Sequence, residues 1–216
     1  MDILILVIGI VGFAFAIIVH EIAHGLVAEK LGDPTARLMG RLTLNPIPHI
    51  DILGTIILPL TLLLIRSPLL FGWAKPVPVD PYNLKNPKKD MALISLAGPL
   101  SNICLAIILS ISLRILLVIS PQTILFSLFF YMIQFNIALA IFNLIPVNPL
   151  DGGKILTGLL PEKEAQAYNS FLNKFGMILI MIMIFPLFGG SSLVSIIISP
   201  VISFFLKLLI PGYSFI

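Results

Sequence analysis

The chain has 216 residues, of which 58% are hydrophobic and 11% are charged, with a formal net charge of +3. Soluble domains carry about 25% charged residues, so this composition predicts a protein embedded in the lipid bilayer, and the length predicts a single domain, residues 1–216. The weak and scattered positive charge excludes nucleic acid as the main partner, and the single Cys104 excludes an intramolecular disulfide.

Five apolar stretches are long enough, or nearly so, to cross about 30 Å of hydrocarbon as helices. They are residues 3–27, 91–118, 123–145, 174–188 and 192–210. The first stretch follows an acidic residue and has no small-residue cleavage site, so we expect a retained helix rather than a signal peptide. A sixth stretch, 52–65, is short and contains Pro59, which fits a span or a re-entrant element. The expected fold class is an all-α polytopic membrane protein.

Two segments between these stretches have the composition of short edge strands. Residues 37–45 alternate loosely between polar and apolar side chains, and residues 71–79 are β-branched but contain two prolines. Strands at membrane depth need protein or a water-filled cavity to cover them. We therefore expect both to be short strands associated with the membrane.

The sequence His20-Glu-Ile-Ala-His24 lies near the end of the first stretch. Histidines four residues apart share one face of a helix, so both can present a nitrogen to one zinc ion. Glu21 stands beside them and can take a proton from an attacking water. This pattern also arises by chance on soluble helices, but ionisable residues so close together in an apolar helix are costly and usually functional. The pattern predicts a metal site.

A catalytic zinc ion keeps three protein ligands, so one more ligand is needed. Asp151 follows the stretch 123–145 at a break marked by two prolines, and two glycines after it allow a close approach of the backbone. Asp151 is well placed to be this ligand, although capping of a following helix is an alternative role for it. We interpret His49 as a polar residue at a segment boundary rather than as a ligand.

Three motifs together resemble the site-2 protease family of intramembrane zinc metalloproteases, in its short form without PDZ or CBS domains. They are HEIAH, Ala97-Gly-Pro-Leu-Ser-Asn102 and Asn143-Leu-Ile-Pro-Val-Asn-Pro-Leu-Asp-Gly-Gly153. The resemblance implies that one zinc ion is bound and that Glu21 is the catalytic base, with the metal ligands being His20, His24 and Asp151. By the same resemblance we assign to substrate binding Asn143, Pro146 and Asn102, the last within a motif that also serves packing. It further implies that a membrane-associated hairpin at 71–79 guides the substrate.

The function expected from this resemblance is that of a zinc-dependent endopeptidase within the membrane. It would cleave peptide bonds in or near transmembrane segments of membrane-protein substrates, as in regulated intramembrane proteolysis. The alternatives are a membrane metal transporter and a metal-binding scaffold without hydrolytic activity. A transporter favours polar residues along both halves of the membrane, and a scaffold has no need for Glu21. The sequence indicates no oligomeric state.

The metal ligands must lie at one membrane depth, which restricts the topology. If residues 52–65 crossed the membrane, Asp151 would lie on the side opposite the histidines; if they dip in and return around Pro59, it lies on the same side. In the second case the Lys and Arg residues of 28–50, 67–90 and 146–173 share one side, and the loops 119–122 and 189–191 have none. Basic loops face the cytoplasm, so we expect an active site towards the cytoplasm in the plasma membrane of a prokaryote.

This topology places residue 78 in the cytoplasm, because it follows the re-entrant element on the basic side. Reporter fusions at residue 78 should give a cytoplasmic signal. An extracytoplasmic signal would contradict the re-entrant topology.

Overall fold

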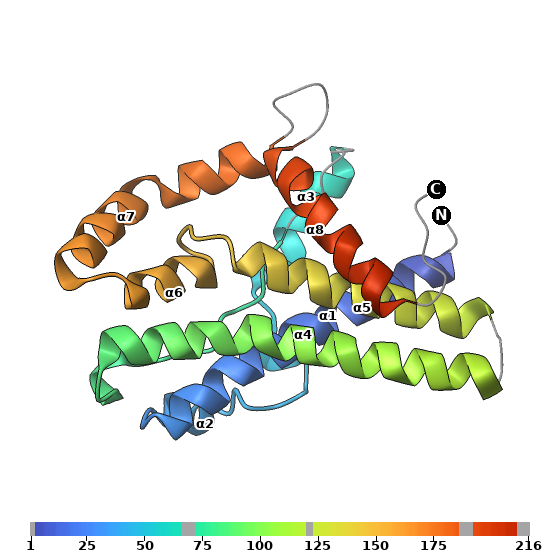
Figure 1. The fold of residues 1–216 in the computed structure, drawn as a ribbon, viewed down its shortest axis with the longest axis horizontal. Helices are drawn as coiled ribbons and strands as arrows, with labels where there is room; N and C mark the ends of the chain where they lie inside the picture. The colour runs from blue at the N-terminus through green and yellow to red at the C-terminus, as the bar shows by residue number, and fades with distance from the viewer. Residues whose placement is uncertain (1–2, 66–71, 120–122, 186–191, 211–216) are drawn as a thin grey trace.

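The computed structural model describes residues 3–65, 72–119, 123–185 and 192–210 (Figure 1). Its elements are α1 (Ile3–Lys30), α2 (Thr35–Leu38), η1 (Ile47–His49), η2 (Ile52–Ile57), α3 (Leu58–Leu64), η3 (Pro81–Asn83), α4 (Pro87–Ile119), α5 (Thr123–Asn143), α6 (Asp151–Leu159), α7 (Glu162–Ile184) and α8 (Leu193–Leu209). The described part of the chain is thus helical and connected by irregular segments, as the composition predicted.

A bundle of α1, α4 and α5 forms the centre of the molecule, with its helices side by side along the long axis (Figure 1). α6 packs on α4, α8 packs on α5, and α7 contacts α6 and α8. Between α4, α5 and α8 lies an apolar core of Ala106, Leu113, Ile133, Ile137, Leu206 and Ile210. Because lipid tails are as apolar as these side chains, close packing rather than the release of water holds such helices together.

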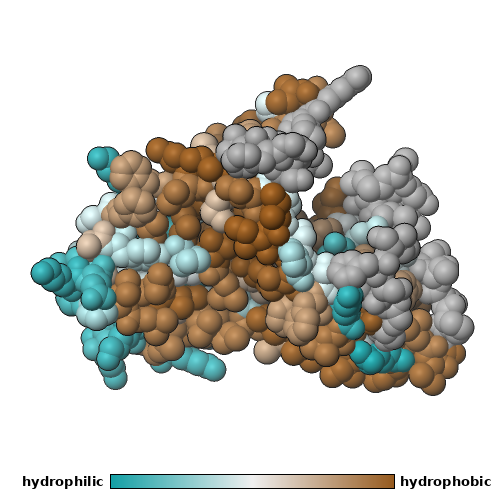
Figure 2. Space-filling model, turned by 45° about the horizontal axis from the view of Figure 1, so that its top comes forward, coloured by the Kyte–Doolittle hydropathy of each residue, from teal (hydrophilic) through white to brown (hydrophobic). Residues whose placement is uncertain are grey.

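The outer surface of the bundle is apolar. Large side chains such as Ile108, Ile111 and Ile178 are more than half exposed, which suits contact with lipid rather than water. Figure 2 shows apolar side chains over most of the visible surface, with hydrophilic ones most concentrated at the end where α2 and the start of α4 lie. The chain is therefore a multi-pass membrane protein.

Within the described residues, four helices are long and apolar enough to cross a membrane: α1, α4, α5 and α7. They correspond to four of the five expected spans. α8 has only 17 residues, so the fifth crossing stays a prediction. α7 begins at Glu162, well before the expected residue 174, because its polar first turns are also helical and carry two glutamates where the helix dipole favours negative charge.

The apolar segment 52–65 forms one continuous helical element of η2 and α3. With six and seven residues it is at most about 20 Å long, too short to cross the hydrocarbon. The sequence led us to expect that the chain turns back around Pro59, but it does not. Pro59 lies in the first turn of α3, where a missing N–H is tolerated, so the helix continues through it. Helix α3 continues to Leu64 and residues 66–71 lie outside the described residues.

The segment that follows α3 lies beside the segment that precedes η2. The backbone N–H of Trp73 donates to the carbonyl of Gly54 at 3.2 Å, and that of Lys75 donates to the carbonyl of His49 at 2.9 Å. The segments that enter and leave η2–α3 are therefore neighbours.

The two strands expected from the sequence do not form in the described residues. The first part of 37–45 belongs to α2 and then turns at Gly40, whose φ of +65° favours glycine. The described part of the other, residues 72–79, forms neither helix nor strand; residue 71 is not described. Pro76 and Pro78 have no N–H to donate, and the N–H of Val77 between them bonds to a side chain.

Candidate metal centre and active site

Three buried side chains that are distant in sequence meet at one point of the bundle. His20 and His24 come from α1, where a spacing of four residues places them on one face, and Asp151 is the first residue of α6. The Oδ2 atom of Asp151 lies 3.0 Å from Nε2 of His20 and 3.3 Å from Nε2 of His24. One possible ligand atom from each residue lies within 4.8 Å of the others.

The protons on the two imidazoles are directed away from this meeting point. Nδ1 of His20 lies 2.7 Å from Oδ1 of Asn102, and Nδ1 of His24 lies 2.7 Å from the carbonyl oxygen of Ile94. Both oxygens only accept hydrogen bonds, so each imidazole donates from Nδ1 and, when neutral, has a lone pair at Nε2. Three hydrogen-bond acceptors therefore face one another in a buried site.

A divalent cation fits this arrangement. Oδ2 of Asp151 is buried and has no hydrogen-bond donor among the described residues, so its charge is uncompensated unless a cation lies beside it. Tetrahedral ligands about 2 Å from a zinc ion stand about 3.3 Å apart, close to the two contacts to Asp151. Two imidazoles and one carboxylate are also the ligand set of known catalytic zinc sites. His20, His24 and Asp151 could thus hold one zinc ion.

Gly98 allows α4 to pass directly over the two imidazoles. A Cβ atom at this position would lie 2.5 Å from Cε1 and Nε2 of His24 and 2.6 Å from Cε1 of His20. Any side chain would displace at least one ring. The glycine of the Ala97–Asn102 motif is therefore a packing requirement of the metal site.

The glycines after Asp151 serve a similar purpose. A Cβ atom on Gly152 would overlap the carbonyl oxygens of Leu144 and Ile145, and one on Gly153 would lie 2.9 Å from the backbone nitrogen of Asn148. The loop 144–150 therefore folds tightly over the start of α6. The carboxylate of Asp151 is buried and directed to the histidines, which favours the ligand role over helix capping.

Glu21 lies on the neighbouring face of α1 and is held by a backbone N–H. Its Oε2 accepts a hydrogen bond of 2.7 Å from the backbone nitrogen of Val77. The guanidinium group of Arg41, itself buried, donates to the carbonyls of Lys75 and Pro76 and so fixes the segment that carries this N–H. One carboxylate oxygen of Glu21 is thereby occupied.

The buried carboxylate of Asp33 anchors the other end of this segment. It accepts hydrogen bonds from the backbone N–H of Asp80 at 2.7 Å and from the side chain of Asn83 at 2.9 Å, as well as from Thr35. Burial would raise the pKa of Asp33, but these hydrogen bonds outweigh burial and hold the pKa below its ordinary value. Asp33 therefore stays charged and ties the end of α1 to the chain after residue 79.

The residues assigned to substrate binding by resemblance lie in different surroundings. Asn143 is half-buried at the end of α5 and donates to the carbonyl of Leu139, and Pro146 is exposed in the loop before α6. Asn102 is fully buried, and its carboxamide contacts His20. The structure does not bring Asn102 to a surface that a substrate could reach; it places it behind a metal-site histidine.

Other residues lie near the site, and His49 stays outside the metal group, as the sequence indicated. His49 is buried, with Nε2 2.9 Å from the carbonyl oxygen of Thr43, and it does not join the metal group. Sequence reasoning missed Val77, Arg41 and Asn136. Val77 acts through its backbone and leaves no signal in the sequence, whereas an asparagine within the apolar helix α5 is a signal that could have been used.

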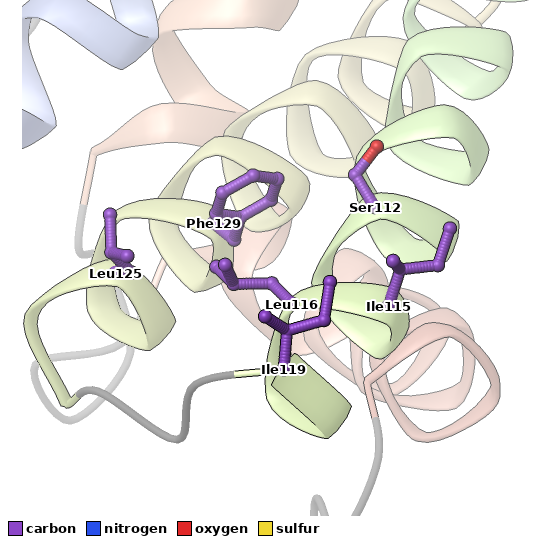
Figure 3. A pocket seen from close by; sticks show the side chains of 6 residues that line it. All are labelled: Ser112, Ile115, Leu116, Ile119, Leu125 and Phe129. Atoms are coloured by element: carbon purple, nitrogen blue, oxygen red, sulfur yellow. The ribbon is translucent and has the colours of Figure 1, made fainter.

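An apolar groove elsewhere on the bundle is separate from this site. It lies between α4 and α5 and is lined by Ser112, Ile115, Leu116, Ile119, Leu125 and Phe129 (Figure 3). From Gly98 to this groove is roughly 20 Å or more along α4. Its lining has no ionisable group, so it offers no chemistry for the metal site.

The fold is that of a multi-pass membrane protein, and its site has the residues of a metalloprotease metal centre. The chain belongs to peptidase family M50, the site-2 protease family, whose sequence profile matches residues 114–183. The protein named "Putative zinc metalloprotease YwhC" of Bacillus subtilis is 39% identical over 170 residues, covering 76% of this chain and 74% of that protein.

Two further relatives carry similar names. "Putative zinc metalloprotease MJ0611" of Methanocaldococcus jannaschii is 29% identical over 160 residues, or 72% of each chain. "Putative zinc metalloprotease Rip2" of Mycobacterium tuberculosis is 26% identical over 180 residues, covering 83% of this chain and 67% of that protein. No solved structure matches the chain. These comparisons support a zinc metalloprotease.

The close approach of α4 to the imidazoles can be tested with Gly98→Ala. Because the added Cβ would overlap both rings, we expect the purified protein to lose most of its bound zinc, measured by elemental analysis, while its helical circular dichroism is retained. Gly9→Ala is the matched control, since a Cβ there meets only Phe135 at 3.8 Å. Equal zinc content in Gly98→Ala and the wild type would contradict this packing.

Proposed function

We propose that this protein is an intramembrane zinc metalloendopeptidase that cleaves peptide bonds in or near transmembrane segments of membrane proteins. The observation that carries the proposal is the buried group of His20, His24 and Asp151 with the carboxylate of Glu21 beside it. This group belongs to helices that are apolar on their outer surface, so the bonds within reach are those of other membrane proteins.

Glu21 is the general base in this proposal. A zinc ion bound by the three ligands supplies a Lewis acid, which polarises a peptide carbonyl and makes a water acidic near neutral pH. The N–H of Val77 fixes Oε2 of Glu21 and leaves Oε1 to accept the proton of the attacking water. Glu21 then gives this proton to the leaving amine, so the carboxylate is restored after each cycle.

The substrate must unwind before its peptide bonds can be attacked, because a transmembrane helix keeps its carbonyls in hydrogen bonds. We place the unwound segment beside residues 72–79, where it can bind in the manner of strand addition through backbone groups that are not already bonded. Asn143 and Pro146, at the break between α5 and α6, are proposed to bind its backbone. The half-buried position of Asn143 and the exposure of Pro146 support this role.

In the proposed topology η2–α3 is re-entrant and the metal site opens towards the cytoplasm. Support comes from the short length of η2–α3 and from the hydrogen bonds that pair the segments entering and leaving it. The named relatives come from Bacillus subtilis, Methanocaldococcus jannaschii and Mycobacterium tuberculosis. All are prokaryotes, which supports the plasma membrane of a prokaryote as the location.

Glu21→Gln tests the mechanism. The amide oxygen can still accept from Val77, but the side chain can no longer take up a proton, so cleavage of a single-span reporter in lipid vesicles should fall by at least about 100-fold. Bound zinc should stay at the wild-type level. Glu29→Gln, which changes a glutamate of the same helix that pairs with Arg37 instead, should cleave normally. Full activity of Glu21→Gln would refute the mechanism.

The substrate class can be tested in cells. Membrane proteomes of cells carrying the wild type and Glu21→Gln are compared by mass spectrometry. We expect intact single-span proteins to accumulate in the variant, because their cleavage stops. Accumulation of soluble proteins alone would contradict intramembrane cleavage.

A further inference from the structure

A chain of hydrogen bonds leads from His20 into the interior of the bundle. His20 Nδ1–H donates to Oδ1 of Asn102, and Nδ2 of Asn102 donates to Oδ1 of Asn136 at 2.8 Å and to the carbonyl of Ala16 at 3.0 Å. Nδ2 of Asn136 in turn donates to the carbonyl of Met132 at 2.8 Å. The chain thus connects α1, α4 and α5.

The two carbonyls fix the direction of every hydrogen bond in this chain. Backbone carbonyls only accept, so Ala16 and Met132 require the NH₂ groups of the two asparagines to face them. Oδ1 of Asn136 must then face Asn102, and Oδ1 of Asn102 must face His20. A reversed Asn102 would present its NH₂ group to His20, and the ring would have to use its lone pair at Nδ1 rather than at Nε2.

Asn136 is placed where an apolar residue would be expected. It is fully buried, one helical turn from Ile133 and beside Ile137, both in the apolar core. Burying a carboxamide is unfavourable unless its groups are paired, and the apolar core already joins α5 to α4 and α8. Helix packing alone therefore does not explain why a carboxamide is buried at position 136.

We propose that Asn136 is a positioning residue of the metal site. It holds the carboxamide of Asn102, and through it the imidazole of His20, in the orientation that presents Nε2 to the metal. This inference rests on the proposed zinc site and adds to it a residue of α5, a helix that contributes no ligand. Ala16 supports Asn102 as well, so the contribution of Asn136 is partial.

The test is the affinity of the purified full-length protein for zinc, measured by competition with a chelator. Loss of a group that orients a metal ligand typically lowers affinity about 10- to 100-fold, which we expect for Asn102→Leu. For Asn136→Leu we expect about a 3- to 10-fold loss, because Ala16 still holds Asn102. Gln134→Leu is the control, because it also replaces a carboxamide of α5 by leucine but lies outside the chain of hydrogen bonds. It should bind zinc like the wild type.

The double variant separates positioning from packing. If Asn136 acts through Asn102, Asn136→Leu has no further effect in the Asn102→Leu background. An equal loss in both backgrounds would overturn the proposal, and so would wild-type affinity in the single variant Asn136→Leu. A wild-type protein that binds no zinc would instead refute the proposed function.

A second variant covers the case in which Asn136→Leu does not fold. In Asn136→Ser, the new hydroxyl group can bond to the carbonyl of Met132 within its own helix. The shorter side chain cannot reach Asn102 as well. It should show the same loss of zinc affinity and an altered visible absorption spectrum of bound Co²⁺, because the position of His20 is less fixed. Wild-type affinity and an unchanged Co²⁺ spectrum in Asn136→Ser would overturn the proposal.

Discussion

Three hydrogen-bond acceptors lie close together inside the bundle and repel one another. The surrounding residues must hold them in place against this repulsion. A carboxylate oxygen of Asp151 lies 3.0 and 3.3 Å from Nε2 of the two histidines, and among the described residues no donor bonds to it. Such a group is stable only with a cation, and it binds a cation well only if its atoms are held in place. The glycines, carbonyls and asparagines around it serve this purpose.

Helix α1 presents the two histidines and Glu21 on different faces. The face with His20 and His24 is covered by α4 and α6, which fix the rings and supply the third ligand. The face with Glu21 and Gly25 is covered by the segment around Val77, and a Cβ on Gly25 would lie 3.1 Å from the side chain of Val77. The candidate metal ligands and the proposed base Glu21 are thus held by different parts of the fold.

Much of this arrangement could be predicted from the sequence. The histidine spacing is local, so their shared face follows from helical geometry alone, and the apolar stretches gave the main helices within a few residues, except at the start of α7. Asp151 was one candidate with an alternative role until the family resemblance and the membrane topology supported it. Its position beside the histidines in the structure agrees with that assignment.

The remaining features depend on tertiary contacts that no local pattern contains. Residues 72–79 have β-branched side chains typical of a strand, but their N–H groups bond to Glu21, Gly54 and His49, or are missing at the prolines, and no ladder forms. Asn102 matched a motif and was assigned to the substrate, yet its burial places it against His20. The motif drew attention to Asn102, but its partner His20 could be found only from the structure.

The ligands come from opposite thirds of the chain, and this has a consequence for biosynthesis. Once α1 has been synthesised, two of the three candidate ligands, His20 and His24, are present. Asp151 follows only after α4 and α5 have been made. Until then the nascent chain has an incomplete centre while its helices enter the membrane beside those of other proteins. The candidate metal site is therefore complete only late in translation, once the helices that surround it have been made.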